Sequence, residues 1–186
     1  MKKTFAALLL TACLIAMPQL EASAHEKNVS AQNFSQAEQQ SSDVQFLDTM
    51  VKHHEDGIKM FQMAVDKAQS PAVKVMAEKM VKDQKKEIPE LQALRNEVEP
   101  QAPKAINTNM PGMMPMDMSK LEKASGTQFD REFLFMTIDH HKGAIKMADM
   151  ALEKTHNSAV KDKAQMIHNK QKDEVERMEN MLKEIN

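Results

Sequence analysis

Residues 46–60 read FLDTMVKHHEDGIKM, and residues 133–147 repeat this pattern as FLFMTIDHHKGAIKM. The two copies keep one constant offset of 87 residues, which pairs the equivalent positions His53 and His140, His54 and His141, and Met60 and Met147. A histidine pair followed by a methionine at the same spacing is therefore present twice. This repeat predicts two copies of one structural unit, and the fold depends on how the two pack together.

The apolar residues of the first copy recur with the period of an amphipathic helix. At 100° per residue, one stripe contains Phe46, Met50, His53, Gly57, Met60 and Ala64. An adjacent apolar stripe contains Leu47, Val51, His54, Ile58, Phe61 and Val65. Charged residues occupy the opposite face. Both histidines are therefore predicted to point toward the interior of the fold.

Each copy is followed by a second helical pattern, so that two helical hairpins are predicted, over residues 43–98 and 130–186. Ser70-Pro71 is typical of the start of a helix, while Pro89 is expected to kink or divide that helix. Each hairpin has one apolar face, and two such faces are most simply buried against each other. We therefore expect an all-α four-helix bundle over residues 43–186, with a long crossover and a pseudo-twofold arrangement.

The composition supports a helical protein of about one domain. The 186 residues include 18 methionines but no tryptophan, no tyrosine and only four glycines. Few glycines and few aromatic residues favour helix over sheet. A formal net charge of −2 gives no electrostatic reason to bind nucleic acid, which is excluded as a partner.

The first 24 residues have the pattern of a cleaved export signal. Lys2-Lys3 precede an apolar run over residues 4–17, and Ala22-Ser23-Ala24 fits a cleavage site. The run is too short for a permanent membrane span, so none is expected after the signal is removed, and the mature protein is expected in the periplasm. Alternatively, Leu10-Thr11-Ala12-Cys13 resembles a lipoprotein processing site.

Cys13 is the only cysteine, and it lies within this signal. A mature chain without thiols excludes disulfides, zinc–thiolate sites and a cysteine nucleophile. Cleavage after Ala24 would make His25 the mature N-terminus, whose amine and imidazole together suit Cu(II). Residues 25–42 are polar and are expected to form a flexible arm.

Methionine thioethers accompany the imidazoles at helical spacing. The candidate metal ligands are His53, His54, Met50 and Met60 in the first copy, and His140, His141, Met136 and Met147 in the second. Neighbours on a helix point 100° apart, so one histidine of each pair is expected to bind an ion while the other packs or hydrogen-bonds. Thioethers and imidazoles without thiolate favour copper, Cu(I) above all, and silver could substitute. The alternative is core histidines with gap-filling methionines.

Residues 99–129 are predicted to be a linker rich in methionine and proline. Four prolines argue against regular structure there, namely Pro100, Pro103, Pro111 and Pro115. Five methionines lie close together, namely Met110, Met113, Met114, Met116 and Met118. We interpret the segment as a flexible arm that captures Cu(I). Alternatively, it is a disordered tether in which methionine is merely tolerated.

Four polar residues interrupt the apolar faces of the second and fourth helices at equivalent positions, namely Gln84, Glu87, Gln171 and Glu174. An unpaired buried carboxylate is costly, so these side chains need partners. We expect them to hydrogen-bond the inward histidines and to fix their tautomers, as supporting groups do around metal-bound imidazoles. Alternatively, they lie at a solvated edge of the bundle.

The pattern Phe-x6-His-His-x3-Ile-x-Met-Ala, followed by Gln-x2-Glu-Ile/Val, resembles a bacterial family catalogued as domain of unknown function 305. The resemblance covers roughly residues 43–185 and implies a ferritin-like four-helix bundle; some members are periplasmic copper-binding proteins linked to copper tolerance. It carries over the motif positions His53, His54, Met60, His140, His141 and Met147. The copies depart from each other, since Met50 is displaced to Met136 and Phe61 is replaced by Ala148.

These observations predict a periplasmic copper-binding protein, not an enzyme, that buffers, sequesters or shuttles copper in copper tolerance. Its expected partners are copper ions and other periplasmic copper-handling proteins. A di-iron oxidase would need Glu-x-x-His on two helices, and only Glu153 and His156 have that spacing. Two alternatives remain open: a copper-dependent oxidase or reductase, and a methionine-rich helical interaction protein without metal.

Overall fold

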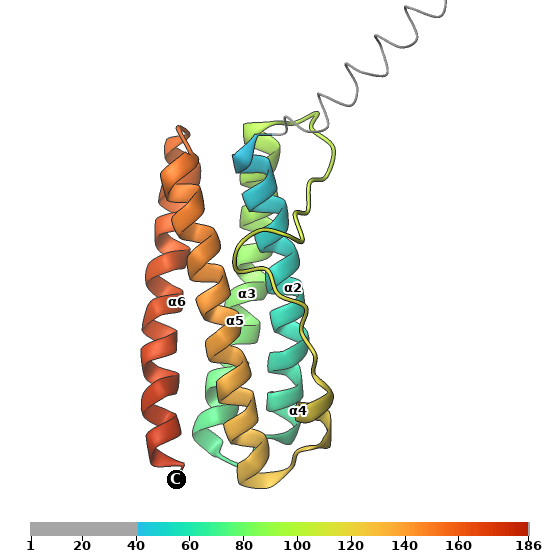
Figure 1. The fold of residues 1–186 in the computed structure, drawn as a ribbon, viewed down its shortest axis with the longest axis vertical. Helices are drawn as coiled ribbons and strands as arrows, with labels where there is room; N and C mark the ends of the chain where they lie inside the picture. The colour runs from blue at the N-terminus through green and yellow to red at the C-terminus, as the bar shows by residue number, and fades with distance from the viewer. Residues whose placement is uncertain (1–40, 186) are drawn as a thin grey trace, which may run out of the picture. The chain divides into compact units, whose positions relative to one another are not determined.

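The structure is a computed structural model that describes residues 41–185 (Figure 1). Four long helices form the bundle: α2 (Ser42–Lys67), α3 (Pro71–Val98), α5 (Gly126–Lys154) and α6 (Ser158–Glu184). A short helix, α4 (Ser119–Lys123), precedes α5, and no strand occurs among the described residues. The predicted all-α four-helix bundle, built from two hairpins and a long crossover, is confirmed.

The predicted export signal and most of the predicted N-terminal arm lie outside the described residues. The same is true of Cys13, Ala24 and His25. Between residues 41 and 185, every helix is too short or too polar to cross a membrane.

Each hairpin packs internally, and the main packing between the two hairpins is that of α2 against α5. α2 packs along α3, α5 packs along α6, and the contact between α2 and α5 joins the hairpins (Figure 1). One apolar cluster gathers around Phe46, Leu91 and Ile167, and a second gathers around Phe61 and Phe133. In all four long helices, the polar residues predicted to face inward fall between the segments that build these two clusters.

The helix starts follow from local hydrogen bonds. The side chain of Ser41 accepts the Val44 N–H at the start of α2, and Asn157 accepts two backbone N–H groups at the start of α6. Ser70 precedes α3 but makes no such bond with its side chain. Instead, Asp130 of α5 accepts the N–H groups of Gln69 and Ser70, at 3.0 and 2.7 Å. This carboxylate ties the turn of the first hairpin to the second.

Two details differ from the sequence-based expectation. α3 continues through Pro89 without dividing, because Pro89 is exposed and water can satisfy the carbonyl that loses its donor. α5 begins at Gly126, earlier than the predicted Asp130, and α4 lies within the predicted linker. Asp117 accepts the Ser119 N–H at 3.0 Å, which supports the start of α4 despite the nearby prolines.

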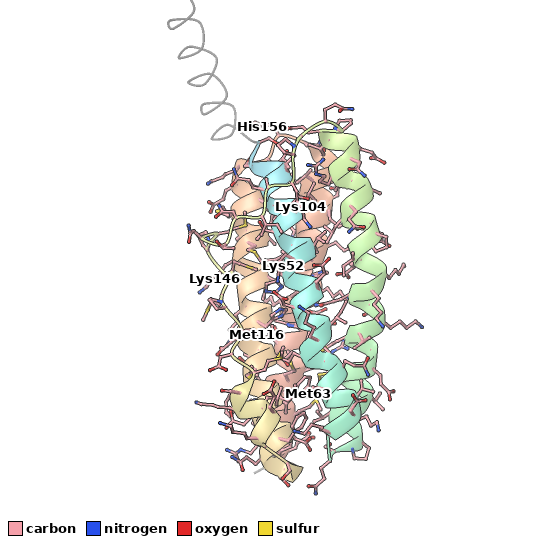
Figure 2. The ribbon with its side chains drawn as sticks, turned by 90° about the vertical axis from the view of Figure 1, so that its right-hand side faces the viewer. Lys52, Met63, Lys104, Met116, Lys146 and His156 are labelled. Atoms are coloured by element: carbon pink, nitrogen blue, oxygen red, sulfur yellow. The ribbon has the colours of Figure 1, made fainter. Side chains whose placement is uncertain are left out.

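The linker after α3 lies against the bundle. Arg95 donates to three linker carbonyls, those of Glu99, Ala102 and Pro103. Asp48 of α2 accepts the Ala105 N–H at 2.8 Å. Figure 2 looks onto this face, with Lys104 near the start of the linker and Met116 further along it. The arrangement differs from the predicted flexible arm, because hydrogen bonds to backbone groups hold a segment that has little regular structure.

Candidate metal site

His53 of α2 and His140 of α5 meet where the two hairpins join. Their rings stack with centroids 3.6 Å apart and planes inclined by 27°. His140 donates from Nε2 to the backbone carbonyl of His53 at 3.1 Å, since a carbonyl can only accept. His53 is buried, with 3% of its surface exposed, while His140 is half-buried. The repeat thus brings one histidine of each pair together.

The other histidine of each pair is buried deeper and is held by a glutamate. The Nε2 atom of His54 lies 2.9 Å from a carboxylate oxygen of Glu87, and the Nε2 atom of His141 lies 2.9 Å from one of Glu174. Both glutamates are buried, so the alternative of a solvated edge is wrong. These are the hydrogen bonds expected for the glutamates. They fix the donor nitrogen of each ring as Nε2 if the carboxylates are ionised.

Gln84 and Gln171 are also buried, but neither reaches a histidine by a hydrogen bond found in the structure. The Oε1 atom of each side chain has no hydrogen-bond partner among the described residues. The two glutamines therefore lie between the two apolar clusters, as the histidines do, but the expected hydrogen bonds to imidazole are made by the glutamates alone.

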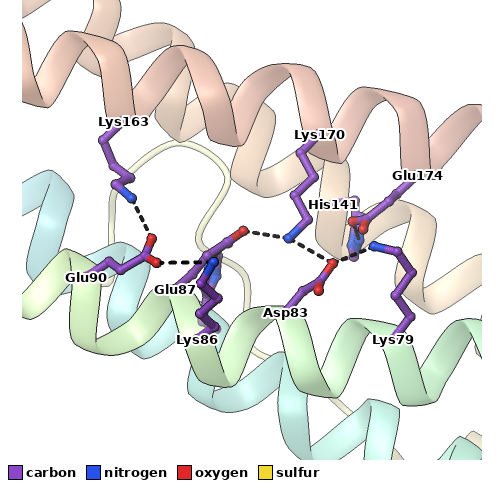
Figure 3. A network of polar contacts seen from close by, with 10 residues as sticks. Lys79, Asp83, Lys86, Glu87, Glu90, His141, Lys163, Lys170 and Glu174 are labelled. Atoms are coloured by element: carbon purple, nitrogen blue, oxygen red, sulfur yellow. Dashed lines mark hydrogen bonds and ion pairs between the residues drawn. The ribbon is translucent and has the colours of Figure 1, made fainter.

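A charged network surrounds Glu87 but not its equivalent in the second hairpin. Lys170 of α6 lies between Glu87 and Asp83 of α3, and its ammonium is 3.1 Å from the Asp83 carboxylate (Figure 3). Burial raises the pKa of Glu87, but hydrogen bonds from His54 and Lys170 outweigh it and lower that pKa from 4.5 to about 2. Glu87 is therefore a carboxylate at neutral pH.

The two stacked histidines are held in their neutral form. Burial lowers the pKa of His53 well below its ordinary value, and the neighbouring imidazole of His140 lowers it further. Burial, with the nearby His141 and His54, lowers the pKa of His140 to about 3. Metal ions bind neutral imidazole, so protons compete weakly for these two rings above that pH range.

All four imidazoles leave one nitrogen unpaired. The Nδ1 atoms of His53, His54, His140 and His141 are buried and have no hydrogen-bond partner among the described residues. An unsatisfied buried polar atom costs about 1–3 kcal/mol, so four in one place need an explanation. A nitrogen lone pair without a proton donor is what a metal ion requires.

A pocket opens beside the stacked pair, between α2, α5 and the linker. Its volume is about 120 Å³, and its lining combines three kinds of donor: imidazoles from His53 and His140, thioethers from Met114, Met116 and Met136, and carboxylates from Asp117 and Asp139. Gly112 and Pro115 complete the lining. Within residues 41–185, no three His, Cys, Asp or Glu side chains cluster closely enough to hold an ion by themselves. A metal here would therefore use the thioethers, which favours a soft ion.

The predicted methionine ligands divide into two groups. Met114, Met116 and Met136 line the pocket. Met50, Met60 and Met147 are fully buried in the apolar clusters. Met110 is buried in the cluster around Phe46, and Met113 packs against that cluster, while Met118 packs against the cluster around Phe61 and Phe133. The structure does not bring this second group to the pocket. Helical spacing placed Met50, Met60 and Met147 on the correct face, but the core needs their volume at those positions.

Two glycines inside helices make room around the histidines. A Cβ atom at Gly57 would lie 2.7 Å from Cε1 of His140 and 2.8 Å from Oε1 of Gln84. A Cβ atom at Gly143 would lie 2.3 Å from the backbone oxygen of Gly112 in the linker. Neither glycine was identified as a functional residue from the sequence, although an isolated glycine within a helical pattern is a signal of close packing. Asp117, Asp139 and Lys170 were not identified either, and the sequence carries no comparable signal for them.

The sequence matches one protein family twice. The family is described as Domain of unknown function (DUF305), and the matches cover residues 16–95 and 96–182. No curated protein matches the chain.

Solved structures share this fold along most of the chain. A Cu(II)-bound form of CopM is 30% identical, with a TM-score of 0.68, and the match covers 77% of this chain and 97% of CopM. A Cu(I)-bound form of CopM is 29% identical, with a TM-score of 0.66 and coverage of 78% and 98%. A DUF305 protein from Streptomyces coelicolor, described as secreted, is 24% identical, with a TM-score of 0.70 and coverage of 78% and 92%, and shows the fold alone. The internal repeat, the bundle and the two family matches agree, and the chain belongs to the DUF305 family.

Proposed function

We propose that this protein binds copper outside the cytoplasm, with Cu(I) as the preferred ion and silver as a substitute. It acts as a buffer, a sequestering protein or a shuttle in copper tolerance, and its further partners are other periplasmic copper-handling proteins. The bound ion is its cargo, and no catalytic step is part of the proposal.

One observation carries this proposal: two neutral imidazoles and three thioethers line the same pocket. His53 and His140 come from equivalent positions of the two hairpins, and Met136 accompanies them on α5. Met114 and Met116 come from the linker. Thioethers are poor ligands for zinc, magnesium or calcium and good ligands for Cu(I), while imidazole accepts either oxidation state of copper. Asp117 and Asp139 add oxygen donors that suit Cu(II).

The two histidines of each pair have different roles in this proposal. His53 and His140 bind the ion, because they line the pocket. His54 and His141 are held by Glu87 and Glu174 and shape the layer behind it. One copper site is thus shared between the hairpins, and each hairpin contributes one imidazole.

The relatives and the N-terminal sequence support the same reading. CopM, which is 29–30% identical to this chain, has been solved with Cu(I), Cu(II) and silver. The pattern of Lys2-Lys3, an apolar run and Ala22-Ser23-Ala24 is typical of export. A thioether site without thiols suits an oxidising compartment, where thiols are consumed by disulfide chemistry.

The test is a competition between the mature protein and a chromogenic Cu(I) chelator. We expect one Cu(I) per chain at the shared site, and weaker binding when His53 or His140 is replaced by alanine. His54→Ala and His141→Ala serve as comparison variants, and they should weaken binding less. Absence of binding by the wild-type chain would overturn the proposal. Loss of binding only in the His54 and His141 variants would place the ion deeper in the bundle.

A further inference from the structure

At Gly112 and Gly143, the backbone of the linker meets the backbone of α5 without intervening side chains. A Cβ atom at Gly143 would lie 2.3 Å from the Gly112 oxygen, and a Cβ atom at Gly112 would lie 2.1 Å from the Gly143 oxygen. Real Cβ atoms do not approach backbone this closely, so both positions require glycine. Gly112 also has a φ of +98°, which disfavours any residue with a side chain.

This contact lies next to the proposed copper ligands. Gly143 follows His140 by three residues on α5, which places both on one side of the helix. The Nε2 atom of His53 lies only 3.5 Å from the Cβ position at Gly143. On the linker, Met114 and Met116 follow Gly112 within four residues, and both line the pocket.

Other contacts fix the linker on both sides of this point. After it, Leu121 is fully buried, and Lys67 donates to the carbonyls of Leu121 and Glu122. Before it, Arg95 and Asp48 hold residues 99–105, and Thr49 accepts the Asn107 N–H at 2.9 Å. Met110 is buried, with 3% of its surface exposed, and its carbonyl accepts the Met113 N–H at 2.8 Å. Met114, in contrast, is 71% exposed. The contact between Gly112 and Gly143 therefore holds the linker against α5 immediately before Met114 and Met116, which line the pocket.

We propose that Gly143 is a positioning residue that seats the linker, so that its thioethers reach the imidazoles of His53 and His140. This inference rests on the proposed function, and it adds how one site obtains ligands from both the bundle and the linker. A side chain at either glycine would lift the linker and separate the thioethers from the imidazoles. The imidazoles would stay in place, because they are held by the bundle.

Two substitutions approach the contact from opposite sides. Gly143→Ala and Gly112→Ala should each weaken Ag(I) and Cu(I) binding by about 10- to 100-fold, the range found when groups that orient metal ligands are lost. The double variant should be no worse than either single variant, since both break one contact. Thr108→Ala, an exposed linker position, is the matched control and should bind as the wild type does.

A double-mutant cycle between Gly143 and Met116 shows whether the glycine acts through the thioether of Met116. Met116→Leu alone should weaken Ag(I) binding, and adding Gly143→Ala to it should produce little further loss. Cu(II) binding, which keeps the imidazoles and the Asp139 carboxylate of α5 when the linker moves, should change less than Ag(I) binding in every one of these variants. In the metal-free protein, amide hydrogen exchange over residues 110–116 should become faster in Gly143→Ala, while the unfolding midpoint stays near that of the wild type.

The outcomes separate this inference from the proposed function. If the wild-type chain fails to bind Ag(I) and Cu(I), the proposed function is wrong. If it binds them through His53 and His140, but Gly143→Ala and Gly112→Ala bind equally well, the positioning role is wrong and the copper site stands. Should Gly143→Ala unfold, Gly112→Ala decides alone, because the substituted residue lies in the linker and outside the four long helices.

Discussion

The two hairpins are alike in their inner layer and differ where they face the linker. His54 with Glu87 and His141 with Glu174 have the same 2.9 Å separation, at positions exactly one repeat apart in the sequence. Toward the linker and the pocket, equivalent positions hold different residues: Thr49 contacts the linker where the second copy has Met136, and Gly143 contacts it where the first copy has Asp56. The two repeated hairpins therefore form one pocket whose two sides carry different residues.

The pair of Thr49 and Met136 shows how this inequality arises. Thr49 accepts a backbone N–H from Asn107 of the linker, at 2.9 Å. Met136, at the equivalent position of α5, lines the pocket. The methionine of the first copy lies one residue later, at Met50, and is fully buried in the core. A shift of one residue therefore turns a methionine from core packing to the pocket wall.

The largest expected effect tests whether the hairpins share one site. His53→Ala and His140→Ala should each weaken Cu(I) binding by more than about 100-fold. Loss of a group that only supports a metal ligand weakens binding by about 10- to 100-fold, and these variants lose a ligand itself. The double variant should be little worse than either single one, because each alone dismantles the same site. Competition with a chromogenic chelator measures all three. Two independent sites would instead appear as half the stoichiometry in each single variant.

The next effect concerns the one-sided charge network. Glu87→Gln should lower the free energy of unfolding by about 1–3 kcal/mol, since both His54 and Lys170 lose their charged partner. Glu174→Gln should cost less, because Lys170 keeps its contact with Glu87. Urea unfolding of the metal-free proteins measures the difference. Equal losses in the two variants would mean that Lys170 contributes nothing.

A smaller effect is expected at the glycine that makes room for His140. Gly57→Ala should weaken Cu(I) binding by about tenfold, because the new methyl group displaces the His140 ring. Ala144→Gly is the matched change in the other hairpin. It should lower the free energy of unfolding by about 1 kcal/mol through helix propensity and leave Cu(I) affinity unchanged. A loss of affinity in Ala144→Gly and not in Gly57→Ala would reverse the assignment.

The smallest effect appears in acid. The pKa of Glu87 is about 2 in the folded protein and near 4.5 when the chain is unfolded. Its contribution to stability is therefore complete above the higher value and is lost as the pH falls toward the lower one. Urea midpoints of the metal-free protein should fall more steeply between about pH 5 and about pH 3 than those of Glu87→Gln. The lowered pKa values of His53 and His140 add a decline in acid that both proteins share. An identical decline in both proteins would contradict this assignment.

The bundle could be predicted because its information is periodic. The stripe through Phe46, Met50, His53 and Met60 and the polar interruption at Glu87 and Glu174 each follow from helical spacing. All of these side chains are buried in the structure, on the sides that the sequence predicted. Helical spacing also predicted that the glutamates lie near the histidines, because each glutamate follows its histidine by the same number of residues in both hairpins.

The pocket could be predicted only in part. Helical spacing gives the face of a residue but not its depth, so Met60 and Met147 could not be distinguished from Met136 as ligands. The course of the linker depends on contacts such as Arg95 with the Pro103 carbonyl and Asp48 with the Ala105 N–H. Such contacts join a side chain to irregular backbone far along the chain, and no periodic pattern records them.

The long crossover also bears on how such a chain can evolve. It lets α2 and α5 run in opposite directions, as the two halves of a symmetric dimer do (Figure 1). A single hairpin could close this bundle only by pairing with a second copy of itself, and every substitution would then appear twice. Fusion into one chain removes that constraint. One half can acquire a residue that contacts the crossover, as Thr49 does, while the other has a residue that lines the pocket, as Met136 does.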